Sequence, residues 1–116
     1  VLYLDRKNRL TQAQFRLVQG GGGGISLSSG SATITGSTIS GNTALSGGYY
    51  NGGGGIWNKV ALNLVDSIIT VNTANSIGGG VRMSTDGGGS LQLSNTTISG
   101  NSATVDPDCA GAGCPD

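Results

Sequence analysis

The pentapeptide TISGN decides the fold of this chain. It occupies residues 38–42 and recurs at residues 97–101 of the 116-residue sequence. A third copy, IITVN at residues 68–72, keeps the apolar second residue and the final asparagine. The copies are spaced by 30 and 29 residues. A period in this range is typical of a solenoid, a propeller or another array of structural units.

Each pentapeptide ends a longer unit that opens with three glycines and a branched apolar residue. The openings are GGGI at residues 22–25, GGGI at residues 53–56 and GGGV at residues 78–81. The middle of each unit alternates, as in ATIT from Ala32, LNLV from Leu62 and LQLS from Leu91, and a period of two indicates a β-strand. No stretch of residues 20–105 has apolar residues at helical spacing. The units therefore predict an all-β fold, a right-handed parallel β-helix of about three turns.

Stacked units place equivalent side chains above one another, about 4.8 Å apart. The inward apolar columns predicted in this way are Ile25, Ile56 and Val81; Ile34, Leu64 and Leu93; and Ile39, Ile69 and Ile98. The column predicted to form a ladder of stacked amides is Asn42, Asn72 and Asn101. Asparagine suits the end of a strand because it tolerates left-handed backbone angles, and the glycines are assigned to sharp corners.

The composition limits the chemistry that the chain can perform. It has 23 glycines, an apolar share of 35% and neither histidine nor glutamate. A composition rich in glycine and serine is also typical of a flexible linker, but the recurring apolar columns favour an ordered fold. No run of 18 apolar residues is present, so we expect no transmembrane helix.

Charge divides the chain unevenly. Residues 1–19 hold four basic residues against one aspartate, whereas residues 20–116 hold two against five. We interpret residues 1–19 as an N-terminal cap or a junction with unrelated sequence, and a degenerate extra turn stays open as an alternative. The basic residues are interpreted as a solvated face and not as a nucleic-acid site, because apolar residues interrupt them. Residues 20–105 form the repeats, and residues 106–116 a tail.

The tail contains both cysteines. In an exported protein, Cys109 and Cys114 are predicted to close a small disulfide loop. Two thiols without histidine make a poor zinc site, and the chain offers no base to activate a catalytic cysteine. Asp106 and Asp108 are interpreted as solvated tail residues. We expect no cofactor and no metal.

The pairing of GGGI with ISGN resembles the GGA[ILV] and FxxN repeats of polymorphic outer-membrane proteins, and more broadly the right-handed parallel β-helix repeat proteins of bacterial cell surfaces. The chain departs from the first pattern by isoleucine in place of phenylalanine and glycine in place of alanine. The residues concerned are Ile39, Ile69, Ile98, Gly24, Gly55 and Gly80. The ending DPDCAG from Asp106 also resembles the segment after such repeats, where more chain continues. The resemblance implies a fragment of a secreted or outer-membrane stalk or adhesin of a bacterium.

An adhesive module would bind a glycan or a host-surface protein, and two groups of residues are candidates. The first is aromatic: Tyr49, Tyr50 and Trp57 lie within nine positions, and Trp57 points outward if Ile56 points inward. Exposed aromatic rings stack on sugars or anchor a partner, although these residues equally suit the shielding of a corner. The second is the outward side of the pentapeptides, namely Thr38, Ser40, Thr70, Thr97 and Ser99.

Two other functions compete with adhesion. Enzymes that cut acidic polysaccharides, similar to pectate lyases, also use parallel β-helices, but they need clustered carboxylates. Asp66 has Gly36 and Asn95 as its column equivalents, and Asp86 lies in a loop, so we expect no catalytic residues. The flat hydroxyl array on the pentapeptides is instead similar to that of ice-binding solenoids.

Overall fold

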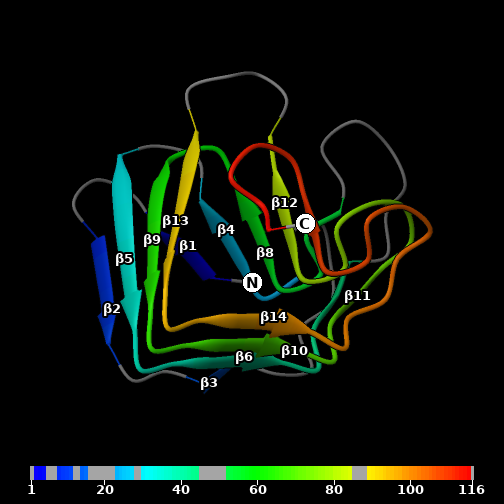
Figure 1. Cartoon of the computed structure of the whole chain (residues 1–116), viewed down its shortest axis with the longest axis horizontal. Coiled ribbons are helices and arrows are strands. Elements are labelled where there is room, and N and C mark those ends of the chain that lie inside the picture. The colour runs from blue at the N-terminus through cyan, green and yellow to red at the C-terminus, as the bar shows by residue number, and fades with distance from the viewer. Residues whose placement is uncertain are drawn as a thin grey trace.

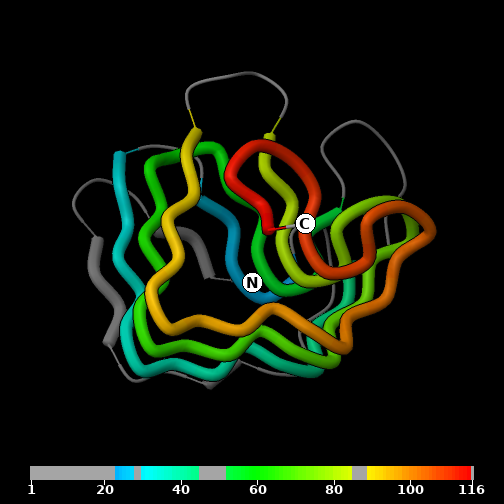
Figure 2. Tube along the Cα trace, in the orientation of Figure 1, coloured from blue at the N-terminus to red at the C-terminus, as the bar shows by residue number. Residues whose placement is uncertain are grey.

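A computed structural model describes the backbone of residues 2–4, 8–11 and 14–15, and the whole of residues 23–27, 30–44, 52–84 and 89–115. In these residues the protein is all-β, without a helix, and every strand pairing is parallel. The strands lie in stacked sheets, and the chain follows nearly the same path in each repeat unit (Figures 1 and 2). This arrangement is consistent with a parallel β-solenoid.

Each sheet takes one strand from each successive unit. Sheet A has the order β1 (Leu2–Leu4), β4 (Ile25–Leu27), β8 (Ile56–Asn58), β12 (Val81–Met83) and β15 (Cys109–Ala110). Sheet B consists of β2 (Asn8–Thr11), β5 (Ser31–Thr35), β9 (Ala61–Val65) and β13 (Ser90–Ser94). Sheet C consists of β3 (Gln14–Phe15), β6 (Thr38–Ser40), β10 (Ile68–Thr70) and β14 (Thr97–Ser99). The short strands β7 (Thr43–Ala44) and β11 (Thr73–Ala74) form sheet D.

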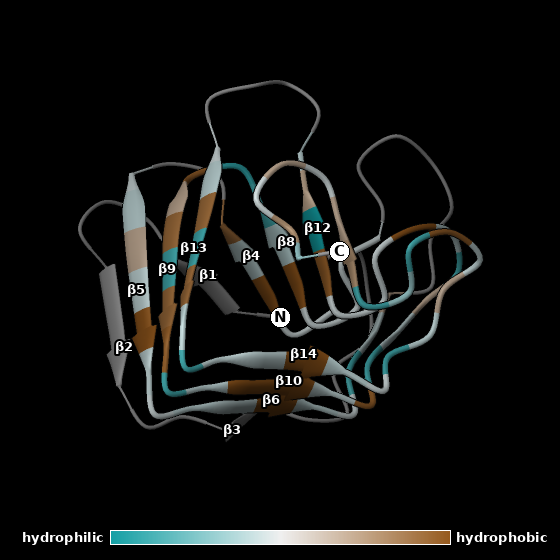
Figure 3. Ribbon diagram, in the orientation of Figure 1, coloured by the Kyte–Doolittle hydropathy of each residue, from teal (hydrophilic) through white to brown (hydrophobic). Residues whose placement is uncertain are grey.

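The strand registers confirm the predicted apolar columns. Ile25 pairs with Ile56 and Ile56 with Val81 in sheet A, and the other two columns align in the same way in sheets B and C. The inward residues of β4 to β10 are fully buried, and the apolar residues lie along corresponding parts of neighbouring strands (Figure 3). Leu93 and Ile98 in the last unit are only partly buried against this core. The core is therefore a narrow interior, filled by the inward side chains of each strand.

The segment of residues 1–19 contributes backbone to three of the sheets. Strands β1, β2 and β3 pair in parallel with β4, β5 and β6. This is the pairing of a further repeat unit. The segment has no copy of the glycine or TISGN motif, but Leu2, Leu10 and Phe15 lie in register with the column residues Ile25, Ile34 and Ile39. The division of the chain at residues 19 and 105 stays a prediction.

The predicted asparagine ladder is present in the corner after sheet C. The backbone N–H and the Nδ2 of Asn42 both donate to Oδ1 of Asn72, at 3.0 and 3.1 Å. Asn72 donates in the same two ways to Oδ1 of Asn101, at 2.9 and 3.0 Å. Each rung is also tied to the preceding unit, because Nδ2 of Asn72 donates to the carbonyl of Ile39 and Nδ2 of Asn101 to that of Ile69. The ladder thus satisfies buried polar groups by pairing them with the same groups one unit along.

The third glycine of each unit packs against this ladder. A Cβ at Gly24 would lie 2.9 Å from Nδ2 of Asn42, and one at Gly80 would lie 2.7 Å from Nδ2 of Asn101. A Cβ at Gly55 would lie 3.0 Å from Nδ2 of Asn72 and 2.7 Å from the carbonyl oxygen of Gly80. These separations are shorter than ordinary van der Waals contact. Glycine therefore stands at these three positions because the ladder and the adjacent backbone leave no room for a methyl group.

The tail adds one strand to sheet A. Strand β15 pairs with β12, and the amides of Gly80 and Val81 donate to the carbonyls of Pro107 and Asp108. Cys109 and Cys114 form a disulfide with a Cα–Cα distance of 5.6 Å, and both cysteines pack against the core. The tail thus covers part of the last repeat unit.

Asp108 ends the asparagine ladder, so the interpretation of this residue as a merely solvated tail residue is wrong. Its Oδ1 accepts hydrogen bonds from the backbone N–H and from Nδ2 of Asn101, both at 3.0 Å. It occupies the place that the next asparagine would have in the ladder. The interpretation failed because Asp108 belongs to no TISGN copy and reaches the ladder only when the tail folds back.

We predict that Asp108→Ala lowers the free energy of unfolding by about 1–3 kcal/mol, because the backbone N–H of the nearly buried Asn101 loses its acceptor and Nδ2 of Asn101 loses one of its hydrogen bonds. Asp108→Asn is the matched control: it keeps an oxygen at Oδ1 and should lose clearly less. Urea unfolding followed by circular dichroism measures both. Equal stabilities of the two variants would contradict the capping role.

Candidate binding faces

The predicted hydroxyl residues form two rows on the outer face of sheet C. Thr38, Ile68 and Thr97 align in one row, and Ser40, Thr70 and Ser99 align in the next. All six side chains are partly or fully exposed. The structure thus brings together the second group of residues proposed from the sequence, on strands β6, β10 and β14.

The middle unit makes this face more apolar than the TISGN copies alone would. Ile68 is 47% exposed and Val71 is 64% exposed, where the other two units carry threonine and glycine. Val71 has a φ of 57°, close to the 69° of Gly41 and Gly100. A branched side chain at positive φ is strained, because its Cβ crowds the following carbonyl oxygen. The corner geometry is therefore imposed by the stack, whatever residue occupies the position.

The aromatic group is not an exposed patch in the described part of the chain. Trp57 is only 9% exposed, which disagrees with the first of the two interpretations, an exposed ring, and leaves the shielding role open; Tyr49 and Tyr50 lie outside the described residues. As the next residue along the strand, Trp57 points to the opposite face of sheet A from Ile56, and it lies in register with Ser26 and Arg82. Arg82 is also 9% exposed. An outward position in sheet A is thus covered, and alternation alone does not distinguish outward from exposed.

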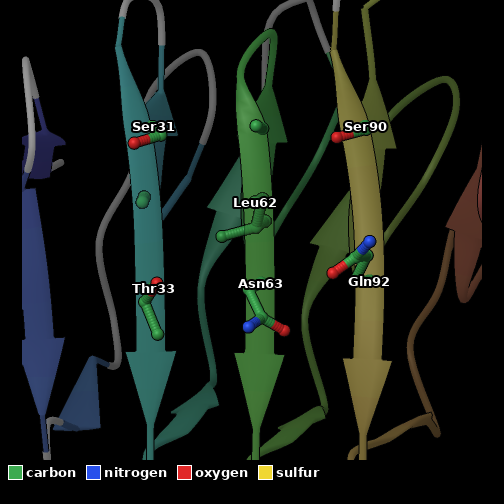
Figure 4. Close-up of a pocket in the computed structure, with 8 residues that line it drawn as sticks. Ser31, Thr33, Leu62, Asn63, Ser90 and Gln92 are labelled. Carbon is green, nitrogen blue, oxygen red and sulfur yellow. The ribbon is translucent and has the colours of Figure 1, made fainter.

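The structure shows a further face that the sequence analysis did not single out. A shallow hollow of about 180 Å³ lies on the outer side of sheet B, over β5, β9 and β13 (Figure 4). Its polar lining residues are Ser31, Thr33, Asn63, Ser90 and Gln92. Ala61 stands between Ser31 and Ser90 in the register, and its small side chain leaves the space. The period-two alternation marks all these positions as outward, but it does not show that they form a hollow.

The side-chain amides of Asn63 and Gln92 in this hollow differ in their hydrogen bonding from the asparagine side chains described above. Within the residues that the structure describes, the side chains of Asn63 and Gln92 make no hydrogen bond, although they are neighbours in register. The side chains of Asn42, Asn58, Asn72, Asn95 and Asn101, by contrast, are all hydrogen-bonded within the protein. The two outward amides are thus left to solvent or to a ligand.

Among the described residues, carboxylates are not gathered at either face. Oδ1 of Asp66 accepts a hydrogen bond from Nδ2 of Asn95 at 2.8 Å. Both residues have positive φ, like Gly36 in the same column, so they form a corner of the stack. Asp86 lies outside the described residues. Among those that are described, no three His, Cys, Asp or Glu side chains are grouped so that they could hold a metal, and no helix is long and apolar enough to cross a membrane.

We predict that Val71→Gly stabilises the protein by about 0.5–1 kcal/mol. Relief of about 1–2 kcal/mol of strain at positive φ exceeds the cost of about 0.5–1 kcal/mol for the extra freedom of glycine in the unfolded chain. Val65→Gly is the matched control, because Val65 lies in strand β9 without positive φ, and it should destabilise. Thermal unfolding measures both changes. A lower melting temperature for Val71→Gly would show that the corner tolerates valine without strain.

We also predict that the fluorescence of Trp57, the single tryptophan, reports a buried indole. The native protein should emit at shorter wavelength than the urea-unfolded protein, and iodide should quench the native emission poorly. Free N-acetyltryptophanamide is the control for full exposure. Native emission at the wavelength of that control would contradict the covered position in sheet A.

Comparisons of the chain with protein-family models, with curated proteins and with solved structures found no match. The evidence on function is therefore the stacking of the repeat units and the outer faces of sheets B and C. Of these, the face of sheet C was predicted from the sequence and the face of sheet B was not.

Proposed function

We propose that the chain is a right-handed parallel β-helix of about three turns. It would act as a structural or adhesive module of a secreted or cell-surface protein, such as a bacterial outer-membrane protein, without catalysis. The observation that carries the proposal is the use of the repeated polar residues. Asn42, Asn72 and Asn101 pair with one another and with Asp108, so the most regular feature of the sequence serves to stack the units.

The carboxylates support the same conclusion. Asp108 ends the ladder and Asp66 is hydrogen-bonded to Asn95, so both have structural partners. A polysaccharide-cutting enzyme needs carboxylates that converge on a substrate or on a cation, often beside a basic residue. The outer faces of sheets B and C instead present hydroxyl, amide and methyl groups, which suit contact with a neutral surface. The disulfide of the tail agrees with an oxidising compartment outside the cytosol.

Ice binding is the second candidate, because of one specific observation. Sheet C aligns Thr38, Ile68 and Thr97 in one row and Ser40, Thr70 and Ser99 in another, at the regular spacing of parallel strands. Such rows present methyl and hydroxyl groups periodically. The partner of this face would then be ordered water and not a glycan or a host-surface protein.

The test compares adhesion with catalysis on the intact protein. Beads coated with the folded protein should be retained on polysaccharide-coated surfaces or on cell monolayers under flow. Beads coated with reduced, unfolded protein serve as the control. The soluble protein should release no reducing ends from pectin. Asp66→Asn should leave retention unchanged, because the side chain of Asp66 only accepts a hydrogen bond from Asn95 and asparagine keeps an accepting oxygen.

Two results would contradict the proposal. Pectin cleavage that Asp66→Asn abolishes would establish an enzyme. Thermal hysteresis that is lost in Thr70→Lys, together with no retention on any surface, would favour the ice-binding alternative.

A further inference from the structure

We propose that the outer face of sheet B is a binding site for a neutral, linear oligosaccharide. This inference rests on the proposed adhesive function and names the site and the ligand class for it. The site is the hollow of Figure 4, lined by Ser31, Thr33, Asn63, Ser90 and Gln92 around Ala61.

The lining residues determine the charge of the ligand. Every described side chain that lines the hollow is uncharged, and the polar groups are hydroxyls and carboxamides, each of which both donates and accepts hydrogen bonds. Among the described lining side chains, an anionic polymer would find no arginine or lysine and a cationic peptide would find no carboxylate. The nearest basic residue by register is Arg9 of β2, which pairs with Thr33 at the edge of the sheet. A ligand that carries many hydroxyls and no charge fits this lining.

The amides of Asn63 and Gln92 provide the second argument. They lie in register on adjacent strands, and the described structure gives neither side chain a hydrogen bond. The amides that stack the units all form hydrogen bonds inside the protein, and the outward pair takes no part in that stacking. Thr33 aligns with them on β5 and extends the row to three neighbouring strands. The row therefore offers polar groups at the strand spacing, about 4.8 Å, which suits a chain of sugar rings lying across the strands.

The position of the hollow argues against a peptide ligand. Its centre lies over β9, which is hydrogen-bonded to β5 on one side and to β13 on the other. A peptide that adds a strand needs an open sheet edge, and one that binds through apolar anchors needs an apolar groove. The apolar lining residues are Ala32, Ala61 and Leu62, and Leu62 is buried in the core. Recognition here must use outward polar side chains.

The face of sheet C is a poorer candidate for the same ligand. Ile68 and Val71 expose branched apolar side chains there, and the described polar side chains beside them on β6, β10 and β14 are hydroxyls. Planar amides give two directed hydrogen bonds each, whereas a hydroxyl rotates to suit water or ligand alike. The amide row therefore distinguishes sheet B from the other outer face.

The experiment titrates isotopically labelled intact protein with hexasaccharides of cellulose, mannan and xylan, followed by amide NMR. At least one neutral probe should shift the side-chain amide signals of Asn63 and Gln92 and the backbone signals of β5, β9 and β13. We expect a dissociation constant on the order of 1 mM, because hydrogen bonds to sugar replace hydrogen bonds to water. A hexamer of galacturonate, as the anionic arm, should bind more weakly than the best neutral probe.

Three variants locate the site. Combined Asn63→Ala and Gln92→Ala should weaken binding about tenfold, because two directed contacts are lost. Ala61→Arg should block binding by filling the hollow. Thr70→Ala on sheet C is the matched control and should leave the affinity unchanged. The emission of Trp57 shows whether each variant keeps its fold.

The inference is overturned if no neutral probe causes shifts, if the shifts centre on sheet C, or if galacturonate binds best. It is also overturned if the double alanine variant binds as well as the native chain. Its failure differs from failure of the proposed function. Beads that are still retained while the hexasaccharides leave sheet B unchanged would disprove this site alone, whereas loss of retention on every surface would disprove adhesion itself.

Discussion

The third glycine of each unit packs closely against the ladder asparagine. This contact brings the glycine motif (GGGI or GGGV) and the TISGN motif of each unit side by side. Gly24 and Asn42 are 18 positions apart, yet a methyl group on the glycine would collide with the amide. Each amide in turn donates to the asparagine of the next unit, or to Asp108 at the end. A larger residue at the glycine would force the ladder amide or the neighbouring backbone to move.

This constraint separates the inside of the protein from its outside. Inside, stacking decides which residue fits each position. Isoleucine and leucine fill the narrow core, asparagine forms hydrogen bonds with the next unit at the corner, and glycine leaves room for the asparagine amide. Outside, the same register arranges whatever side chains are present into straight rows across the sheets. A short chain with few reactive groups can in this way present an extended surface. Such a surface suits binding by many weak contacts more than it suits chemistry at one point.

Several features could be predicted from the sequence because they follow from local periodicity. The three apolar columns and the ladder follow from aligning TISGN with IITVN, since parallel stacking repeats each position in register. Other features depend on chain segments that approach from elsewhere. The sequence left open whether Trp57 is an exposed ring or shields other residues, and in the structure it is only 9% exposed. Asp108 joins the ladder only through the folding of the tail, and its neighbours in sequence give no sign of that.

By itself, the sequence determined the strand period and the residues of the repeats that face inward, because these depend on spacing along one chain. Only the tertiary structure decided which outward positions remain accessible. It left Asn63 and Gln92 beside the small Ala61 in an open hollow, and it covered Trp57 and Arg82. The physical reason is that alternation fixes the side of a sheet on which a residue lies. What packs over that side depends on the path of the rest of the chain.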